Sequence, residues 1–300
     1  MAHSAQTILV TGSNGGFGRL IVETLGRQGH IIFAGMREPT AKNASAAAEL
    51  RVLAEQRQFT LHVVALDVTD STSVTQAVEH TVATTGRLDV VVNNAGVSYI
   101  GPLEAFTLEQ VQQQFDINVF GVWRVNSAAL PHMRAQKSGL LVQVGSVVGR
   151  LAFPFLGLYG ATKFALEGLT ESYRYELAAL GIDAVIVEPG TYPTTIAANR
   201  QLAVDQERLA PYAPVMNAFM PPFFAENRST NPPDPQEVAD AIASLIAQPA
   251  GERPLRTVIA SASQRKAPQA VNDIAASATH SYLEMLGILP QVTLEKKTLP

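Results

Sequence analysis

Short apolar runs alternate along the chain with longer segments in which apolar residues recur every three or four positions. We expect strands at Thr7–Thr11, Ile31–Gly35, Leu61–Leu66, Leu88–Val92, Leu140–Gly145, Asp183–Glu188 and Arg256–Ala260. We expect helices between them, for example at Ala44–Gln56, Ser73–Thr85, Leu108–Arg134 and Tyr159–Leu180. Such alternation is typical of a parallel sheet that helices cover on both faces. The pattern therefore predicts an α/β fold with a sheet of about seven strands.

Neither a long linker nor an internal repeat divides the 300 residues, so we expect one domain over residues 1–300. The alternation breaks at residues 191–235, where seven prolines fall between Pro211 and Pro235. This segment is too long for an ordinary connection and predicts a lid or substrate loop. The tail, residues 261–300, is expected to add one amphipathic helix near Ala275–Leu286.

Composition limits the classes of partner. Apolar residues make up 47% of the chain, which allows a substantial core, and the net charge is −4 without a basic run. This argues against nucleic acid or an anionic membrane as a partner. The absence of cysteine excludes disulfides and thiol catalysis. The first expected strand follows Ser4 closely and leaves no room for a signal peptide, so we expect a cytoplasmic protein.

Tyr159 and Lys163 lie four residues apart in a predicted helix, and Ser146 precedes Tyr159 by thirteen positions. Helical positions i and i+4 share one face, about 5–6 Å apart, so the phenol and the ammonium can point into one site. A nearby positive charge lowers the tyrosine pKa from its usual value of about 10. With a serine that hydrogen-bonds a carbonyl, this set can interconvert a ketone and an alcohol. The spacing alone also occurs in amphipathic surface pairs.

A glycine-rich turn separates the first predicted strand from the first helical pattern. It reads Thr11-Gly12-Ser13-Asn14-Gly15-Gly16-Phe17-Gly18. Glycines let the backbone approach a pyrophosphate, and the helix N-terminus adds free N–H groups and a positive dipole. The glycine spacing is one residue longer than G-x-G-x-x-G. A turn that merely needs glycine is the alternative, but its place between strand and helix favours a dinucleotide site.

Seven sequence elements occur in the order used by the classical short-chain dehydrogenase/reductase family, which the chain therefore resembles. They are Thr11-Gly12-x-x-x-Gly16-x-Gly18, Asp67-Val68, Asn93-Asn94-Ala95-Gly96, Asn118, Ser146, Tyr159-x-x-x-Lys163, and Pro189-Gly190 followed by Thr194. They span residues 7 to about 195, and coarse patterning extends the match to about 260. The resemblance implies a Rossmann-like, doubly wound parallel sheet, and is strongest to NADP-dependent ketoreductases and hydroxysteroid dehydrogenase-like members.

The resemblance also implies roles for these residues. Catalysis would use Asn118, Ser146, Tyr159 and Lys163, with Asn118 in a water-bridged relay to the lysine. The cofactor would contact Gly12, Ser13, Asn14, Gly16, Phe17, Gly18, Asp67, Val68, Asn94, Ala95, Gly96, Tyr159, Lys163, Pro189, Gly190 and Thr194. Some of these residues also have purely structural interpretations. Asp67 could start a turn, Asn94 could hold a strand exit, and Asn118 could mark a helix kink with an exposed side chain.

The end of the second strand predicts the cofactor type. NAD-specific members place an acidic residue there for the ribose 2′-hydroxyl, whereas this chain has Met36 followed by Arg37. A guanidinium pairs well with a 2′-phosphate, and Ser13 or Asn14 could add a hydrogen bond. Glu38 counts against this, because it could neutralise Arg37. We expect NADP, with NAD less favoured.

The expected substrate walls are apolar, which suggests a bulky hydrophobic ketone or alcohol. The candidates are Val97, Tyr99, Phe153, Phe155, Tyr192, Phe219 and Phe223, with Ile100, Leu151, Leu156, Tyr212, Met216, Met220 and Phe224 nearby. The alternative is that these residues pack the lid against the sheet or form an oligomer contact. The family's range leaves steroid, retinoid and broad ketone substrates open.

The motifs together predict an NADP(H)-dependent carbonyl reductase or alcohol dehydrogenase. Ser146 would polarise the carbonyl, Tyr159 would donate the proton, and Lys163 would lower its pKa and hold the ribose. A cofactor-sensing regulator and an epimerase or dehydratase of the same fold are the alternatives, which the complete catalytic set disfavours. A small-molecule substrate and a homodimer or homotetramer are expected. No metal site is expected, because no two histidines have ligand spacing.

Overall fold

A computed structural model describes residues 5–194 and 200–294, with Arg228 described by its backbone alone. Seven parallel strands form one sheet in the order β3-β2-β1-β4-β6-β7-β9. Their bounds are β1 Thr7–Thr11, β2 Ile31–Met36, β3 Leu61–Ala65, β4 Val90–Asn93, β6 Gly139–Val144, β7 Ile182–Pro189 and β9 Arg256–Ile259. The predicted doubly wound α/β sheet is confirmed, with strand ends shifted by one or two residues at several places.

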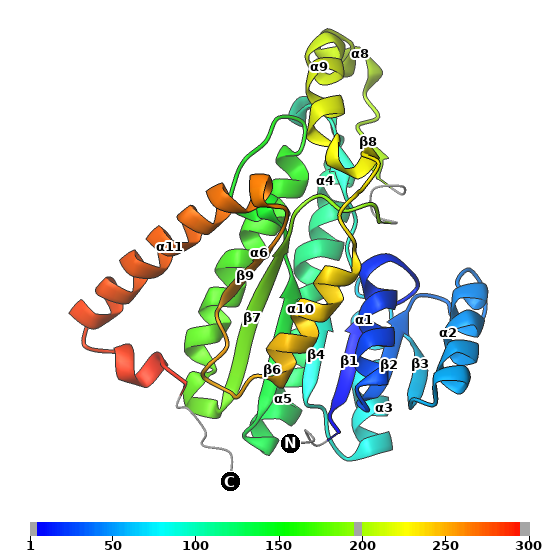
Figure 1. Ribbon diagram of the computed structural model, residues 1–300, viewed down its shortest axis with the longest axis vertical. Coiled ribbons are helices and arrows are strands. Elements are labelled where there is room, and N and C mark those ends of the chain that lie inside the picture. Colours follow the sequence, from blue (N-terminus) through cyan, green and yellow to red (C-terminus); the bar gives the residue numbers. More distant parts are fainter. Residues whose placement is uncertain (1–4, 195–199, 295–300) are drawn as a thin grey trace.

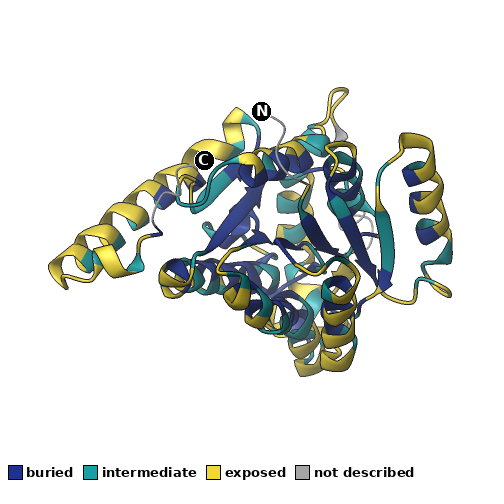
Figure 2. Ribbon diagram, turned by 90° about the horizontal axis from the view of Figure 1, so that it is seen from below, coloured by how far each residue is buried: buried dark blue, intermediate teal, exposed yellow. Residues whose placement is uncertain are grey.

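Helices cover both faces of this sheet (Figure 1). One face carries α1 (Gly16–Arg27), α2 (Ala44–Arg57) and α10 (Gln236–Ala247), and the other carries α3 (Ser71–Thr85), α5 (Gly121–Gln136) and α6 (Gly157–Glu176). Figure 2 shows the strands dark blue between helices whose outer sides are exposed. All eight positions of β7 are buried, as a strand covered on both faces requires.

Two apolar cores result from the alternation of side chains along each strand. Ile8 and Val10 face the core under α1 and α10, whereas Leu9 and Phe33 face the core under α3 and α5. All four side chains are fully buried. Burial of an aliphatic or aromatic side chain of this size contributes about 1.5–3 kcal/mol. The continuous apolar runs of the sequence therefore hold the helices of both layers on one rigid sheet.

The order of the strands reverses at β1. The chain runs outward from β1 through β2 to β3, and β4 then returns to pair with the opposite edge of β1. At such a switch point the loops after neighbouring strands turn to opposite faces and leave a crevice at the carboxyl ends of the strands. The glycine-rich turn after β1 and the Asn-Asn-Ala-Gly turn after β4 meet there.

The prediction of one continuous helix over Leu108–Arg134 is wrong in the middle of that range. It divides into α4 (Leu108–Phe115), a π-helical turn at Asp116–Phe120 and α5. A π turn inserts an extra residue into the helical ladder and is frequent at functional sites. Asn118 lies in this π turn. Asparagine is unfavourable in a regular α-helix, and here it stands where the helix is irregular.

The predicted lid, residues 191–235, contains regular structure. β8 (Gln201–Leu202) pairs with β5 (Tyr99–Ile100), and two helices follow, α8 (Gln206–Leu209) and α9 (Ala213–Phe223). Pro214 falls in the first turn of α9, where proline is tolerated, whereas Pro221 and Pro222 lie inside the helix near its C-terminal end. Residues 195–199 of the predicted lid lie outside the described residues.

The C-terminal helix α11 spans Ala262–Met285, longer than the predicted Ala275–Leu286. It continues through Pro268, which is buried, although proline removes one helical hydrogen bond. The helix starts beside the lid and extends away from the sheet (Figure 1, orange). In the described part of the chain, no helix combines the length and apolar character that a membrane crossing needs. One domain over residues 1–300 remains a prediction.

Candidate active site

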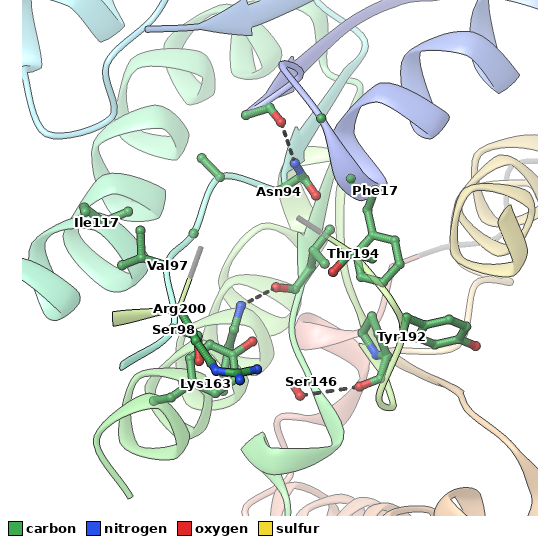
Figure 3. Close-up of a pocket in the computed structure, with 18 of the residues that line it drawn as sticks. Phe17, Asn94, Val97, Ser98, Ile117, Ser146, Lys163, Tyr192, Thr194 and Arg200 are labelled. Atoms are coloured by element: carbon green, nitrogen blue, oxygen red, sulfur yellow. Dashed lines mark hydrogen bonds between the residues drawn. The ribbon is translucent and has the colours of Figure 1, made fainter. Parts of the chain in front are cut away.

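A cavity of about 520 Å³ follows the carboxyl ends of the strands, from the glycine-rich turn to the lid. Most of the predicted site residues line it. They are Gly12, Asn14, Gly16, Phe17, Arg37, Asp67, Val68, Asn94, Ala95, Gly96, Val97, Ser146, Tyr159, Lys163, Pro189, Gly190, Tyr192, Thr194 and Phe223. Residues far apart in the chain are thus gathered at the crevice that the sheet topology predicts. Figure 3 shows several of them around this space.

Close packing fixes the glycine-rich turn. Gly12 has a φ of +68°, and a Cβ there would lie 2.8 Å from Cα of Ala95. At Gly18 a Cβ would overlap the carbonyl oxygen of Gly12, because α1 starts directly against the turn. Gly18 therefore shapes the turn from behind and does not line the cavity. Only glycine meets both the conformational and the steric demand.

Asn94 ties the turn after β4 to the turn after β1. Its side-chain amide donates to the carbonyl oxygens of Thr11, at 2.9 Å, and Gly12, at 3.1 Å. The backbone N–H of Asn94 donates to Oγ1 of Thr11 at 3.0 Å. Asn94 therefore holds the strand exit, as its structural interpretation predicts. It also lies on the cavity wall, so a contact with the cofactor stays a prediction.

The expected cofactor contact from Ser13 is wrong. Ser13 is fully buried and does not line the cavity. Its hydroxyl donates to the carbonyl of Val10 at 2.8 Å, and its backbone N–H donates to the carbonyl of Gly35 at 3.0 Å. Both donors are thus used inside the fold. Asn14, which lines the cavity, instead donates to Oδ1 of Asn43 at 3.2 Å.

Two cations lie at the end of the cavity beyond β2. Arg37 and Lys42 are exposed and line the wall together. Asn43 donates to the carbonyl of Arg37 at 2.6 Å and fixes the loop between them. Among the described residues Arg37 forms no ion pair with Glu38. The carboxylate of Glu38 therefore does not pair with the guanidinium as the sequence had suggested. Sequence reasoning missed Lys42, because no motif sets the register of this loop.

Three of the predicted catalytic residues, Ser146, Tyr159 and Lys163, line the cavity, and Figure 3 labels Ser146 and Lys163 there. Ser146 donates to the carbonyl of Pro189 at 3.4 Å and accepts from the N–H of Val148 at 3.3 Å. Burial raises the pKa of Tyr159 to about 12, and a hydrogen bond with Ser146 opposes that rise. A phenol with this pKa carries its proton at neutral pH and is poised as a proton donor.

The expected lowering of the Tyr159 pKa by Lys163 is wrong for this structure. The Lys163 ammonium donates to the carbonyl of Val144 at 2.7 Å and lies 5.6 Å from the centre of the tyrosine ring. Burial lowers the pKa of Lys163 itself to about 8, against the opposing charge of Glu167. Desolvation thus outweighs the hydrogen bond with Ser146 at Tyr159 and the charge of Glu167 at Lys163.

Asn118 is buried, so the interpretation with an exposed side chain is wrong. Its Oδ1 accepts from the N–H of Val97 at 2.9 Å, and its Nδ2 donates to the carbonyl of Val97 at 2.9 Å. The same amide group donates to Oγ1 of Thr162, next to Lys163, at 3.0 Å. Asn118 thus joins the cavity wall to α6 behind the catalytic residues, and its relay role remains a prediction.

The substrate wall differs from the sequence prediction at Tyr99. The Tyr99 hydroxyl donates to Gln113 at 2.6 Å, and its ring packs away from the cavity. The reason is the alternation along β5, since Ser98 and Ile100 line the cavity and Tyr99 points to the other side. Because side chains alternate along a strand with a period of two residues, the sequence could have identified Ser98 as a cavity residue.

Three predicted aromatic residues lie behind the cavity wall. Phe153 and Phe219 pack against Phe223, with ring centres 5.2 and 5.4 Å away, and Phe155 packs on Phe219 at 6.0 Å. Of these, only Phe223 lines the cavity. The lid thus presents Phe223 to the interior and supports it with a second aromatic layer.

Two further side chains shape the same end of the cavity. Tyr192 lines it but donates its hydroxyl to Glu237 at 2.8 Å, and its ring meets Phe17 edge-on at 5.6 Å. Arg200 was missed from the sequence. It lines the cavity with its guanidinium 5.6 Å from the Phe224 ring and puts a positive charge beside apolar walls. Over the ranges that the structure describes, no three His, Cys, Asp or Glu side chains gather as metal ligands.

Comparisons with known proteins agree with this geometry. The short chain dehydrogenase family profile matches residues 6–205. The chain is 33% identical over 244 residues to 3-ketodihydrosphingosine reductase of Bacteroides thetaiotaomicron, covering 81% of this chain and 84% of that protein. It is 32% identical over 194 residues to NADPH-dependent 3-dehydrocapnine reductase of Ornithobacterium rhinotracheale, covering 63% and 66%. A short-chain dehydrogenase structure from Streptomyces avermitilis superimposes with a TM-score of 0.74 at 29% identity, covering 95% and 98%. The chain therefore belongs to the short-chain dehydrogenase/reductase family and is an oxidoreductase.

Proposed function

We propose that the protein reduces a ketone on a long or bulky apolar molecule with NADPH, and oxidises the corresponding secondary alcohol in reverse. The observation that carries this proposal is the meeting of Ser146, Tyr159 and Lys163 on one wall of a cavity that also reaches the glycine-rich turn. Cofactor and substrate would thus share one space. A secondary alcohol and a ketone differ by a hydride and a proton, and the tyrosine supplies the proton.

The residues present fit NADP. The turn at Gly12 leaves no room for side chains, and the N-terminus of α1 offers backbone N–H groups to a pyrophosphate. Arg37 and Lys42 supply two positive charges for a 2′-phosphate, and Met36 leaves no carboxylate for a ribose 2′-hydroxyl. The NADPH-dependent relative supports the same choice. NAD is the less favoured cofactor.

The side chains divide the proton chemistry among themselves. The nicotinamide supplies or accepts the hydride when NADP(H) is bound. Ser146 orients the carbonyl oxygen by a hydrogen bond. Tyr159 holds the proton on its phenol oxygen and donates it to that oxygen. Lys163, fixed by the Val144 carbonyl at 2.7 Å, keeps a positive charge beside the tyrosine ring, where it would also hold the ribose.

Apolar walls support a lipid-like substrate. Val97, Ile100, Leu156 and Phe223 line the cavity near the catalytic residues. Two relatives carry the names 3-ketodihydrosphingosine reductase and NADPH-dependent 3-dehydrocapnine reductase. Arg200 adds one charged position to this end, suited to a polar head group on an otherwise apolar molecule.

A panel of ketones with NADPH and NADH tests the proposal. It should run from small keto esters through steroids to long-chain 3-keto compounds, with oxidation of the nicotinamide cofactor as the readout. We expect NADPH to be preferred and long apolar ketones to have the highest kcat/KM. Tight NADPH binding without turnover would favour a cofactor-sensing regulator. Product formation without net NADPH oxidation would favour an epimerase or dehydratase.

We further propose a homodimer or homotetramer that works in the cytoplasm. The exposed side chains of Phe120, Trp123 and Phe164, on the adjacent π turn, α5 and α6, support an oligomer contact. Light scattering of the purified protein would give its mass in solution, and a monomer at micromolar concentration would contradict the proposal.

A further inference from the structure

Gln264, in the first turn of α11, holds the loop that follows Pro189 and Gly190. Its Oε1 accepts from the backbone N–H of Thr191 at 2.9 Å, and its Nε2 donates to Oγ1 of Thr191 at 2.7 Å. A backbone N–H can only donate, so the partners fix the orientation of the amide. Thr191 lines the cavity, whereas Gln264 lies behind it.

The second Nε2 hydrogen of Gln264 binds the far end of the lid. It donates to Oε2 of Glu226 at 2.9 Å. Glu226 also accepts from the hydroxyls of Ser261, at 2.9 Å, and Ser263, at 2.6 Å. Its carboxylate thus lies at the N-terminus of the 24-residue helix α11, where the helix dipole favours negative charge. Asn227 and Phe224, its close neighbours in the chain, line the cavity.

Gly190 shows how closely Gln264 approaches this loop. A Cβ at position 190 would lie 2.5 Å from Oε1 of Gln264. The backbone N–H of Gly190 donates to the carbonyl of Ile259 at 2.8 Å, which holds the loop on β9. Glycine at this position is therefore needed for the side chain of Gln264 to reach Thr191. The Pro-Gly pair predicted from the sequence as a cofactor contact also makes room for a residue of the C-terminal helix.

We propose that Gln264 is a positioning residue that couples the cavity wall at Thr191, beside the catalytic Ser146, to the end of the lid segment at Glu226. A single amide binds Thr191, where the lid segment begins, and Glu226, where it returns. The two positions are thus joined through one side chain. The inference rests on the proposed function for its substrate readout, but its cofactor readout stands independently. It gives the first turn of α11, in the C-terminal extension, a role in the reaction.

An exchange of the two side chains tests the coupling. Gln264→Glu removes both donors and places a second carboxylate beside Glu226. Adding Glu226→Gln restores a donor between the two positions, and Thr191 Oγ1 can then donate to the new carboxylate. We expect the single variant to weaken NADPH about tenfold and to lower kcat as well, a size typical of one or two lost hydrogen bonds. The double variant should recover most of both losses.

Adenosine 2′,5′-bisphosphate distinguishes positioning from general damage, because it occupies only the adenosine end of the site. Its Kd should stay within about twofold in every variant, since Arg37 and Lys42 are remote in the fold from α11. Gln269→Glu is the matched control. It lies exposed on the same helix and also places a carboxylate beside another one, Asp273, its partner at 2.8 Å. It should leave both ligands unchanged.

Three outcomes would overturn the proposal: an unchanged NADPH Kd in Gln264→Glu, an equal loss for both ligands, or no recovery in the double variant. If Gln264→Glu fails to fold, Gln264→Met replaces it, since methionine keeps the volume and removes every polar contact. An NADPH Kd within twofold of the wild type in Gln264→Met would equally overturn the proposal. A chain that binds NADPH as predicted but reduces no ketone would refute the proposed function and leave the positioning role standing.

Discussion

The ammonium of Lys163 lies 5.6 Å from the centre of the Tyr159 ring and donates its hydrogen bond to the carbonyl of Val144, at 2.7 Å. The two side chains thus share the i, i+4 face of α6, as their spacing predicts. The phenol nevertheless has a raised pKa, because the effect of burial exceeds that of its hydrogen bond with Ser146. In this state Tyr159 is a proton donor, the form that ketone reduction requires.

Removing the phenol oxygen of Tyr159 should abolish catalysis while leaving cofactor binding intact. We expect Tyr159→Phe to lower kcat about 10²–10⁴-fold, the usual contribution of general acid catalysis, and to change the NADPH Kd by less than about twofold. Tyr99→Phe is the control, because Tyr99 hydrogen-bonds Gln113 outside the cavity. More than a tenth of wild-type turnover in Tyr159→Phe would contradict the proposed mechanism.

Arg37 and Lys42 should set the preference for NADPH. A charged hydrogen bond contributes about 1.5–3 kcal/mol, so Arg37→Ala should weaken NADPH about ten- to a hundredfold and leave NADH nearly unchanged. Lys42→Ala should weaken NADPH in the same direction. Both cations are exposed, so raised salt should weaken wild-type NADPH binding more than the binding of either variant.

Arg51→Ala serves as the control for these two variants, since Arg51 is an exposed arginine of α2 outside the cavity wall. Titrations of both cofactors by fluorescence would measure the effect. Equal Kd values of the wild type for NADPH and NADH would remove the basis for the NADP assignment.

The sequence predicts the sheet and the catalytic set because both depend on local patterns. Successive positions such as Val90, Val91 and Val92 are apolar, as a parallel strand covered on both faces requires. Tyr159 and Lys163 are placed by helix periodicity, and Gly12 by the conformation of its turn. Each of these features is decided within a few residues of chain.

Contacts between distant segments could not be predicted from such local sequence patterns. Ser13 hydrogen-bonds inside the fold to the carbonyl of Val10, and the pairing of β5 with β8 joins segments about a hundred residues apart. Lys42 and Arg200 reach the cavity only through the path of loops without a fixed register. The π turn at Asn118 also depends on tertiary contacts, since Arg124 binds both Asp116 and the carbonyl of Val68.

Glu188 should make the protein less stable as the pH rises. It is fully buried on β7, accepts from Asn272 at 2.7 Å, and lies near Glu167 and Arg256. Burial raises its pKa above the ordinary 4.5, and the charge of Glu167 raises it further. The folded state therefore retains a proton that the unfolded chain releases above pH 4.5. The stabilising contribution is complete below that pH and is lost as the pH rises toward the folded-state pKa.

Glu188→Gln should remove this dependence, because its amide keeps the neutral state at every pH. We expect the Tm of the variant to fall less than that of the wild type between pH 4.5 and 8. A difference of about 1 kcal/mol would appear as roughly 2–4 °C in a chain of this size. Glu55→Gln, at an exposed position of α2, should keep the wild-type slope. Parallel curves for wild type and Glu188→Gln would contradict the assignment.

Phe223 and Phe219 form a matched pair for the proposal that the lid selects the substrate. Their rings stack at 5.4 Å, but only Phe223 lines the cavity. Phe223→Ala should raise KM for long apolar ketones about tenfold or more, since burial of such a side chain contributes about 1.5–3 kcal/mol. Phe219→Ala removes only the support behind the wall and should have a smaller effect.

NADPH affinity should change little in both variants, because the glycine-rich turn and Arg37 belong to other loops of the cavity. The measurement is KM for a series of ketones of increasing chain length, with cofactor held saturating. A loss that grows with chain length in Phe223→Ala would place the apolar tail of the substrate against the lid. Unchanged KM values across the series would mean that α9 merely packs on the sheet, and substrate selection would then fall to Val97, Ser98 and Ile100 on the opposite wall.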